Sequence, residues 1–383
     1  MCAAHALSMT GFSIYPTLLP RLQQEWHLSH SEAGFAGGAL FAGYMLAVPL
    51  LTSLTDRIDA RRVYFAASLF SVAGALGFAL AASGTLSAAL LQAVSGAGVA
   101  GTYMPGLKVL TDNAGAQQSR PVAFYTATFG IGVALSIWCA QWTADALGWR
   151  FAFGIAALGP VVAGAMVLRL PPGPVHAPRP VLAGIGEAWG NRNARPYILG
   201  YAVHCWELFG SRSWMVAFLT FAQGLSVWAV SPASITAVGN LIAPVSSVFG
   251  NELAIRTGRS RFILKVMGMS GALTCLLGFL SGIPAPWLCL LVLAHMALLN
   301  GDSSSLTAGV VAASRPQLRG TTMALHSTFG FGAGFAAPLV FGAALDLAGP
   351  RAWGWGVAFV TIGIGGVLAC LALRLENPAR AGD

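Results

Sequence analysis

Long apolar segments constrain the fold of this chain more than any other feature. Of its 383 residues, 56% are hydrophobic and only 9% are charged, whereas soluble proteins average about 25% charged residues. A helix that spans the hydrocarbon core of a bilayer needs about 20 mostly apolar residues. By that criterion the sequence predicts an all-α polytopic membrane protein in a lipid bilayer. It has twelve spanning helices, at about 2–20, 31–54, 63–82, 86–110, 120–143, 149–169, 196–222, 231–254, 261–282, 285–311, 318–345 and 352–374.

One connection is longer and more polar than the others. Residues 170–195 begin with Pro171 and Pro172 and contain further prolines, which end helices. This segment divides the chain into four predicted parts: a bundle of six helices at 1–169, a linker at 170–195, a second bundle of six helices at 196–374, and a tail at 375–383.

The distribution of cations predicts the topology. With the N-terminus inside, sixteen of the 21 Lys and Arg residues lie on the inner side, Arg21, Arg150 and Arg351 lie outside, and Lys108 and Arg212 lie within spans. An excess of cations in short loops marks the cytoplasmic face. We therefore expect both termini and the linker in the cytoplasm, and a location in a bacterial cytoplasmic (inner) membrane. This topology explains the net charge of +8 without a nucleic-acid partner.

Nothing in the sequence predicts an enzyme or a resident cofactor. The six cysteines include no CxxC pair, so a disulfide framework or zinc knuckle is not expected. There is no metal-binding helix motif, nucleophile elbow or phosphate-binding loop. No basic segment precedes the first apolar stretch, so that stretch is expected to be a spanning helix and not a cleaved signal peptide.

The two halves of the chain resemble each other. Residues 128–132, Thr-Phe-Gly-Ile-Gly, recur as Thr-Phe-Gly-Phe-Gly at 328–332, an offset of 200. Asp145 and Arg150 recur as Asp346 and Arg351, an offset of 201. A constant offset predicts two pseudo-symmetric bundles. In transporters built from repeats, the substrate binds near the midplane where the repeats meet.

With these features the chain resembles the major facilitator superfamily over essentially its whole length. The motif of that family between helices 2 and 3 is matched by Asp56, Arg57 and Arg61, and partly again by Arg256 and Arg259. Thr52 and Asp59 replace its two glycines. The resemblance implies a two-bundle fold, alternating access, a monomer, and a cytoplasmic latch formed by these five charged residues.

The seventh predicted helix carries three ionisable residues, His204, Glu207 and Arg212. One charge in the hydrocarbon core costs about 2.5–3.5 kcal/mol even on the lenient insertion scale, so this helix is predicted to face a water-filled cavity. The family resemblance implies that helices 1, 4, 7 and 10 line that cavity. The predicted path for substrate and proton comprises His204, Glu207, Arg212, His295, Asp302, Lys108, His5, Asn300, Trp206 and Tyr201.

These residue types predict a secondary active transporter that moves a small polar, anionic solute by proton symport. Arg212, together with Lys108, would attract the anion. Glu207 or Asp302 would carry the coupling proton, and His204, one helical turn from Glu207, would relay it. His295 and Asp302, seven positions apart, would share one helix face.

Each assignment has a structural alternative. Lys108 could pair with Asp112 four residues later, and Glu207 and Arg212 could neutralise each other. The substrate could instead be a transition metal such as copper, or its chelate, because soft ligands lie on the same helices: His5, Met9, Met104, Cys205, His295 and Met296. An alternative of another class is a membrane sensor or assembly factor that transports nothing.

Overall fold

The computed structural model describes residues 1–55, 57–113, 119–173 and 184–376, which form helices and connecting turns without a strand. The α-helices are α1 (Cys2–Ser8), α2 (Ile14–Glu25), α3 (His30–Leu54), α4 (Ala60–Ala81), α5 (Thr85–Asn113), α6 (Ser119–Leu147), α7 (Trp149–Ala156), α8 (Leu158–Leu168), α9 (Ile185–Trp189), α10 (Arg195–Gln223), α11 (Pro232–Thr257), α12 (Arg259–Leu277), α13 (Ala285–Gly301), α14 (Ser303–Ala313), α15 (Arg319–Ala348) and α16 (Ala352–Glu376). Two 3₁₀ turns, η1 (Gly278–Leu280) and η2 (Pro316–Leu318), join them.

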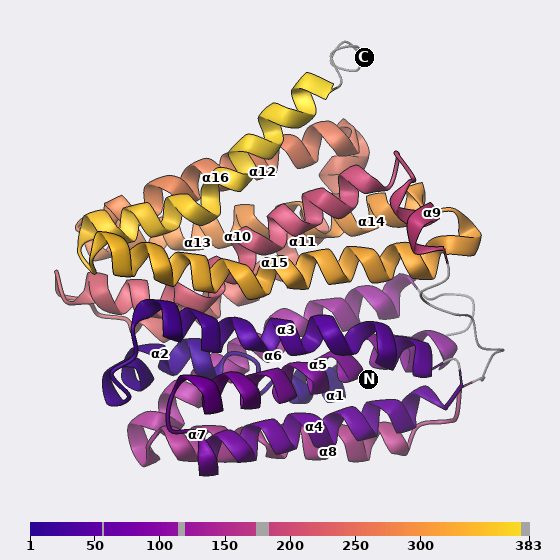
Figure 1. The fold of residues 1–383 in the computed structure, drawn as a ribbon, viewed down its shortest axis with the longest axis horizontal. Helices are drawn as coiled ribbons and strands as arrows, with labels where there is room; N and C mark the ends of the chain where they lie inside the picture. The colour runs from indigo at the N-terminus through magenta and orange to yellow at the C-terminus, as the bar shows by residue number, and fades with distance from the viewer. Residues whose placement is uncertain (56, 114–118, 174–183, 377–383) are drawn as a thin grey trace.

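The helices form two layers (Figure 1). Helices α1 to α8, indigo to magenta, make the N-terminal bundle, and α10 to α16, up to yellow, make the C-terminal bundle. Within the described chain, nine helical segments are long and apolar enough to cross a membrane. The three other predicted spans are also helical, but α1 and α2 are short, and α5 and α10 are long yet less apolar.

Three predicted spans are interrupted, which corrects the continuous helices expected from sequence. The first breaks between α1 and α2, the sixth at Ala157 and the tenth at Asp302. A broken helix leaves backbone groups that need partners. At the first break, the Ser136 hydroxyl donates to the Thr10 carbonyl at 2.7 Å and accepts from the Ser13 N–H at 3.0 Å. The break in the first predicted span and the break in the tenth both lie beside the space between the two bundles, because Phe12, Asn300 and Ser303 line it.

The outer surface of the bundles is apolar. Leu80, Phe249 and Leu347 are 80%, 76% and 90% exposed. In water such side chains would form unfavourable apolar patches, whereas in a bilayer they contact lipid. The exposed apolar residues therefore agree with the predicted multi-pass membrane protein.

One end of the molecule carries the charged loops after α3 and α11; we call it the basic end, and it holds Arg57, Arg61, Arg256 and Arg259. Asp59 caps α4 there by accepting from the Arg61 N–H at 3.0 Å. The equivalent position in the second half is Gly258, whose φ of +92° is accessible to glycine without strain.

The bundles are sealed against each other at the opposite end. Helices α3 and α15 approach so closely that a Cβ at Gly34 would lie 2.1 Å from the Pro338 carbonyl oxygen. Asp346 near the end of α15 accepts from the N–H groups of His30 and Ser31 at 2.9 and 2.8 Å. A carboxylate at a helix N-terminus satisfies free N–H groups and interacts favourably with the helix dipole.

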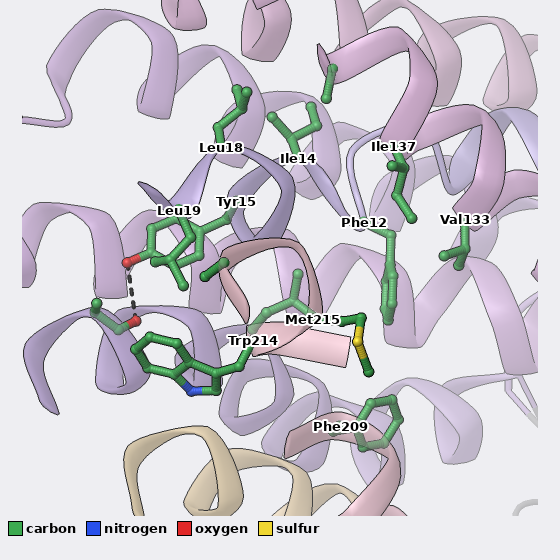
Figure 2. Close-up of a cluster of buried hydrophobic side chains, with 14 of the residues drawn as sticks. Phe12, Ile14, Tyr15, Leu18, Leu19, Val133, Ile137, Phe209, Trp214 and Met215 are labelled. Carbon is green, nitrogen blue, oxygen red and sulfur yellow. Dashed lines mark hydrogen bonds between the residues drawn. The ribbon is translucent and has the colours of Figure 1, made fainter. Parts of the chain in front are cut away.

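A second contact between bundles joins α2 to α10. Figure 2 shows Trp214 of α10 beside Tyr15 and Leu19 of α2, and these three side chains are almost fully buried. Because α2 and α15 both meet the opposite bundle near the same end, this end is closed while space remains toward the basic end.

Candidate functional site

A cavity of about 1010 Å³ lies between the bundles. Its deep part is lined by Phe12 at the helix 1 break and by Arg212 on α10, and it extends to Glu252 and Arg256 at the basic end. The side chains of Glu252 and Arg256 are 58% and 72% exposed. The cavity is therefore open to solvent at the basic end and closed at the other.

The two walls of the cavity differ in chemistry. Among the described residues, the N-terminal bundle contributes apolar, aromatic and hydroxyl side chains but none with a formal charge. The larger of them are Phe12, Tyr44, Tyr103 and Phe129. The C-terminal bundle contributes the acidic and basic side chains of the described lining, which are His204, Arg212, Glu252 and Arg256, and four aromatic side chains, Tyr201, Phe209, Phe249 and Phe331.

Arg212 is the deep cation of this cavity. Its Nη2 lies 3.4 Å from the Asn300 Oδ1, and its Cζ lies 5.7 Å from the centre of the Phe129 ring. Its Nε is buried and has no hydrogen-bond partner in the described chain. A buried donor without a partner is costly, so the site is suited to an acceptor that arrives with a solute.

His204 and Asp302 form a buried pair beside the cavity. The Nδ1 of His204 lies 2.9 Å from Oδ1 of Asp302, which is an ion-pair distance when the ring is protonated. The contact does not have hydrogen-bond geometry: Oδ1 of Asp302 and Nε2 of His204 both lack a hydrogen-bond partner among the described residues. Asp302 reaches His204 because it occupies the break between α13 and α14.

Glu207 faces away from the cavity. Its Oε1 accepts from the hydroxyls of Ser270 and Thr274 on α12 at 2.6 and 2.7 Å. Thr274 also lies 3.1 Å from Nδ1 of His295, whose Nε2 is 3.3 Å from the Ser211 hydroxyl. Glu207 therefore belongs to a polar network inside the C-terminal bundle.

Helical geometry explains this division. At 100° per residue, Glu207 and Arg212 project about 140° apart on α10, so both cannot face the cavity and they do not neutralise each other. His295 and Asp302, which were expected to share a face, both lie against α10: the Nε2 of His295 is 3.3 Å from the Ser211 hydroxyl, and the Oδ1 of Asp302 is 2.9 Å from the Nδ1 of His204. Helix α13 nevertheless ends between them, at Gly301.

The other predicted path residues have different surroundings. Lys108 pairs with Asp112 at 2.9 Å, as its structural alternative stated. Trp206 donates to the Thr361 carbonyl at 3.0 Å and so faces α16. Tyr201 lines the cavity and stacks on His326, with ring centres 3.8 Å apart.

His5 lies in the N-terminal bundle beside the helix 1 break. Its Nδ1 is 2.9 Å from the Thr128 hydroxyl and 3.1 Å from the Tyr125 carbonyl, and its ring stacks on that of Tyr125. Its Nε2 has no hydrogen-bond partner among the described residues. His5 is thus a buried packing residue one layer behind the cavity wall.

Two of the predicted latch residues, Arg61 and Arg256, contact their own bundles. Arg61 binds Asp59 and the carbonyl of Leu170, and Arg256 pairs with Glu252 on the same helix at 2.9 Å. Asp56 lies outside the described residues. Contacts within one bundle are what an open basic end requires.

The soft ligands of the metal alternative are dispersed. Met9 packs toward Gly132 in the N-terminal bundle, while Met296 packs toward Gly239 and His295 faces α10 and α12. Within the described residues, no three His, Cys, Asp or Glu side chains are grouped as metal ligands. No observation favours the metal alternative.

Apart from Tyr201, the aromatic lining of the cavity was not predicted from the sequence. Phe129 lies in the repeated segment 128–132, and Phe331 in its counterpart 328–332; these segments were interpreted only as signs of duplication. Phe12 lies in the non-helical turn between α1 and α2. Because equivalent segments of a repeat lie at the same depth in both bundles, the repeat could have predicted that Phe129 and Phe331 both lie near the cavity.

Comparisons with known proteins agree with this architecture. A nucleoside transporter, NupG, has 16% sequence identity and a TM-score of 0.74, covering 97% of this chain and 98% of that one. A bacterial homologue of the human lysosomal transporter Spinster, in an inward-facing and occupied conformation, has 15% identity and a TM-score of 0.76, with 98% and 95% covered. A POT family transporter in complex with a thioalcohol-conjugated peptide has 10% identity and a TM-score of 0.81, with 98% and 95% covered.

At these identities the solved structures establish the fold only. Among curated proteins, the sequence has no match. The family model described as Major Facilitator Superfamily matches residues 1–338, which is most of the chain. This membership points to a transporter and not to an enzyme, and it confirms the family and fold expected from the sequence. The chain belongs to the Major Facilitator Superfamily.

Proposed function

We propose that this protein is a secondary active transporter of a small organic anion, which it moves by alternating access coupled to protons. The observation that carries the proposal is Arg212. It is a cation deep in a cavity between the bundles, and its buried Nε has no hydrogen-bond partner in the described chain.

The energetics of Arg212 support an anionic solute. A desolvated cation gains most from a partner of opposite charge that also accepts hydrogen bonds. The amide of Asn300 offers one acceptor at 3.4 Å, which is a long and uncharged contact. A carboxylate entering the cavity would supply both the missing charge and the missing acceptor.

In the proposed transport cycle, the end of the cavity that is now closed opens while the basic end closes. In the state described here the cavity opens at the basic end, which the cation count predicts to be cytoplasmic. Opening the other end requires α3 to leave α15, and so requires the contacts of Asp346 with His30 and Ser31 to break. We propose that the latch of Asp56, Arg57, Arg61, Arg256 and Arg259 forms in that second state.

The proposed coupling site is the pair His204 and Asp302. These residues lie on two helices that line the cavity, and His204 is part of its wall. Binding of one proton by the imidazole or the carboxylate of this pair would change the charge of the wall by one unit beside the solute site. Glu207 is less suited to this task because two hydroxyls already hold it away from the cavity.

Uptake into proteoliposomes tests the proposal. The purified full chain, reconstituted and given an imposed proton gradient, should accumulate members of a panel of small labelled organic anions, and a protonophore should abolish accumulation. Accumulation of neutral solutes with no anion transported would contradict the anionic substrate. Full gradient-driven uptake by Asp302→Asn would contradict the proposed coupling site.

A further inference from the structure

We propose that the substrate is an amphipathic monoanion, with one carboxylate that binds Arg212 and a flat aromatic or hydrocarbon body that packs on the wall of the N-terminal bundle. This inference rests on the proposed function and narrows its substrate class. It departs from the hydrophilic solute that the sequence suggested.

The charge of the solute follows from the charges in the described lining. Glu252 and Arg256 pair with each other at 2.9 Å near the mouth of the cavity. When His204 is protonated, its charge is balanced by Asp302 at 2.9 Å. Arg212 is left without a counter-ion. One unbalanced cation matches a single carboxylate, whereas a dianion would leave a negative charge unpaired in a cavity with apolar walls.

The body of the solute follows from the rings beside Arg212. The Phe129 ring lies under the guanidinium of Arg212. The centre of the Phe12 ring is 5.3 Å from the centre of the Phe129 ring, in an edge-to-face arrangement. On the other side, Phe209 and Phe331 have centres 5.5 Å apart, and Tyr44 stacks on Phe331 at 3.7 Å. A flat ring would find edge and face contacts here.

A solute rich in hydroxyl groups fits this lining poorly. On the N-terminal wall, Phe12, Val99, Ala127, Phe129 and Gly130 offer no polar side-chain group, and the polar groups of its described lining are the hydroxyls of Tyr44, Tyr103 and Thr126. Each solute hydroxyl placed against those five residues would lose its hydrogen bonds to water without replacement. The same wall gains free energy by removing an apolar body from water. The cavity therefore separates an anionic head from an apolar body.

Binding of matched probes to the purified full chain tests the inference. The probes are 3-phenylpropionate, its amide, lactate and phenyl phosphate, measured by calorimetry in detergent. We expect 3-phenylpropionate to bind about tenfold or more tighter than each of the others. The amide lacks the charge-assisted hydrogen bond and lactate lacks the ring, each worth a factor of about ten, and phenyl phosphate would bring a second negative charge without a partner. Arg212→Gln should remove the preference for acid over amide, and Phe129→Ala should reduce the preference for 3-phenylpropionate over lactate.

The outcomes separate this inference from the proposed function. Lactate or phenyl phosphate binding as tightly as 3-phenylpropionate, with dependence on Arg212, would overturn the amphipathic monoanion and leave an anion transporter. The amide binding as tightly as the acid would overturn both. Arg192→Gln, at an exposed position outside the cavity lining, is the matched control and should leave all four affinities unchanged.

Discussion

The two bundles share a fold and a repeated sequence, yet they line the cavity differently. The described wall of the N-terminal bundle is built from aromatic, aliphatic and hydroxyl side chains, whereas that of the C-terminal bundle holds His204, Arg212, Glu252 and Arg256. Duplication therefore preserved the scaffold while the chemistry of the two walls diverged. We propose that a cavity of this kind holds the charged head of the solute at the C-terminal wall and its apolar body beside the N-terminal wall.

Removal of the positive charge of Arg212 should have the largest effect, and it tests whether the difference between the two walls matters for transport. Arg212→Gln should lower anion uptake in proteoliposomes by about tenfold to a hundredfold, the value of a lost charge-assisted hydrogen bond. Arg212→Lys, which keeps the charge but loses the planar fork, should retain an intermediate rate. Equal uptake by wild type and the Gln variant would show that the asymmetry of the walls has no function.

The second test separates coupling from binding. Asp302→Asn keeps the size of the side chain and removes its charge, so proton-driven accumulation should fall by about tenfold, a typical loss when one proton-transfer group is removed. Exchange of solute across the membrane without a gradient should persist. Loss of both activities to the same extent would assign Asp302 to solute binding or folding and not to coupling.

The third test concerns the N-terminal wall. Phe129→Ala removes the ring beneath Arg212 and should weaken binding of an aromatic acid about threefold to tenfold, because one aromatic contact is worth about 0.5–1.5 kcal/mol. Binding of lactate should change less. An equal loss for both acids, measured by calorimetry, would show that Phe129 acts on the carboxylate and not on the body.

The fourth test uses Glu207, which shares α10 with Arg212 but lies outside the cavity. Glu207→Gln keeps an acceptor for Ser270 and Thr274 and should change uptake by less than about twofold. Glu207→Ala leaves those hydroxyls unpaired and should destabilise the protein by about 1–3 kcal/mol, seen as a lower melting temperature in detergent. A large loss of uptake in the Gln variant with an unchanged melting temperature would place Glu207 in the proton path.

The smallest effect is expected at the basic end, where Asp59 corresponds to Gly258 of the second half. The hydrogen-bonded Arg61 side chain lowers the pKa of Asp59 below its usual value. A lowered pKa means that the carboxylate stabilises the folded state above the pKa of the unfolded chain, and that this contribution is lost as the pH falls through the folded value.

Asp59→Asn keeps a good helix cap and should cost less than about 1 kcal/mol at neutral pH. Thermal unfolding in detergent from pH 6 to pH 3 should show a smaller loss of stability in the variant than in wild type. The same acid sensitivity in both proteins would exclude a contribution from Asp59.

Sequence reasoning predicted the fold well and the site in part. Apolar segments, cation placement and the 200-residue repeat are properties of long stretches, so they predicted two bundles. That helices 1, 4, 7 and 10 line the cavity was implied by the family resemblance alone, and α6 and α11 also line it. The break at Asp302 was not predictable, because it depends on partners such as Ser247, whose hydroxyl lies 2.6 Å from that of Ser304. Glu207 faces α12 because the hydroxyls of Ser270 and Thr274 on that helix donate hydrogen bonds to it. The sequence pattern of α10 alone contains no information about these partners.

The central claim is that the positive charge at position 212 binds the solute. Chemical rescue tests it most directly: uptake of 3-phenylpropionate by Arg212→Ala is measured with and without added methylguanidinium. The account predicts that the variant is inactive alone and partly restored by methylguanidinium, while Asp302→Asn is not restored. Full uptake by Arg212→Ala without any added cation would contradict the claim.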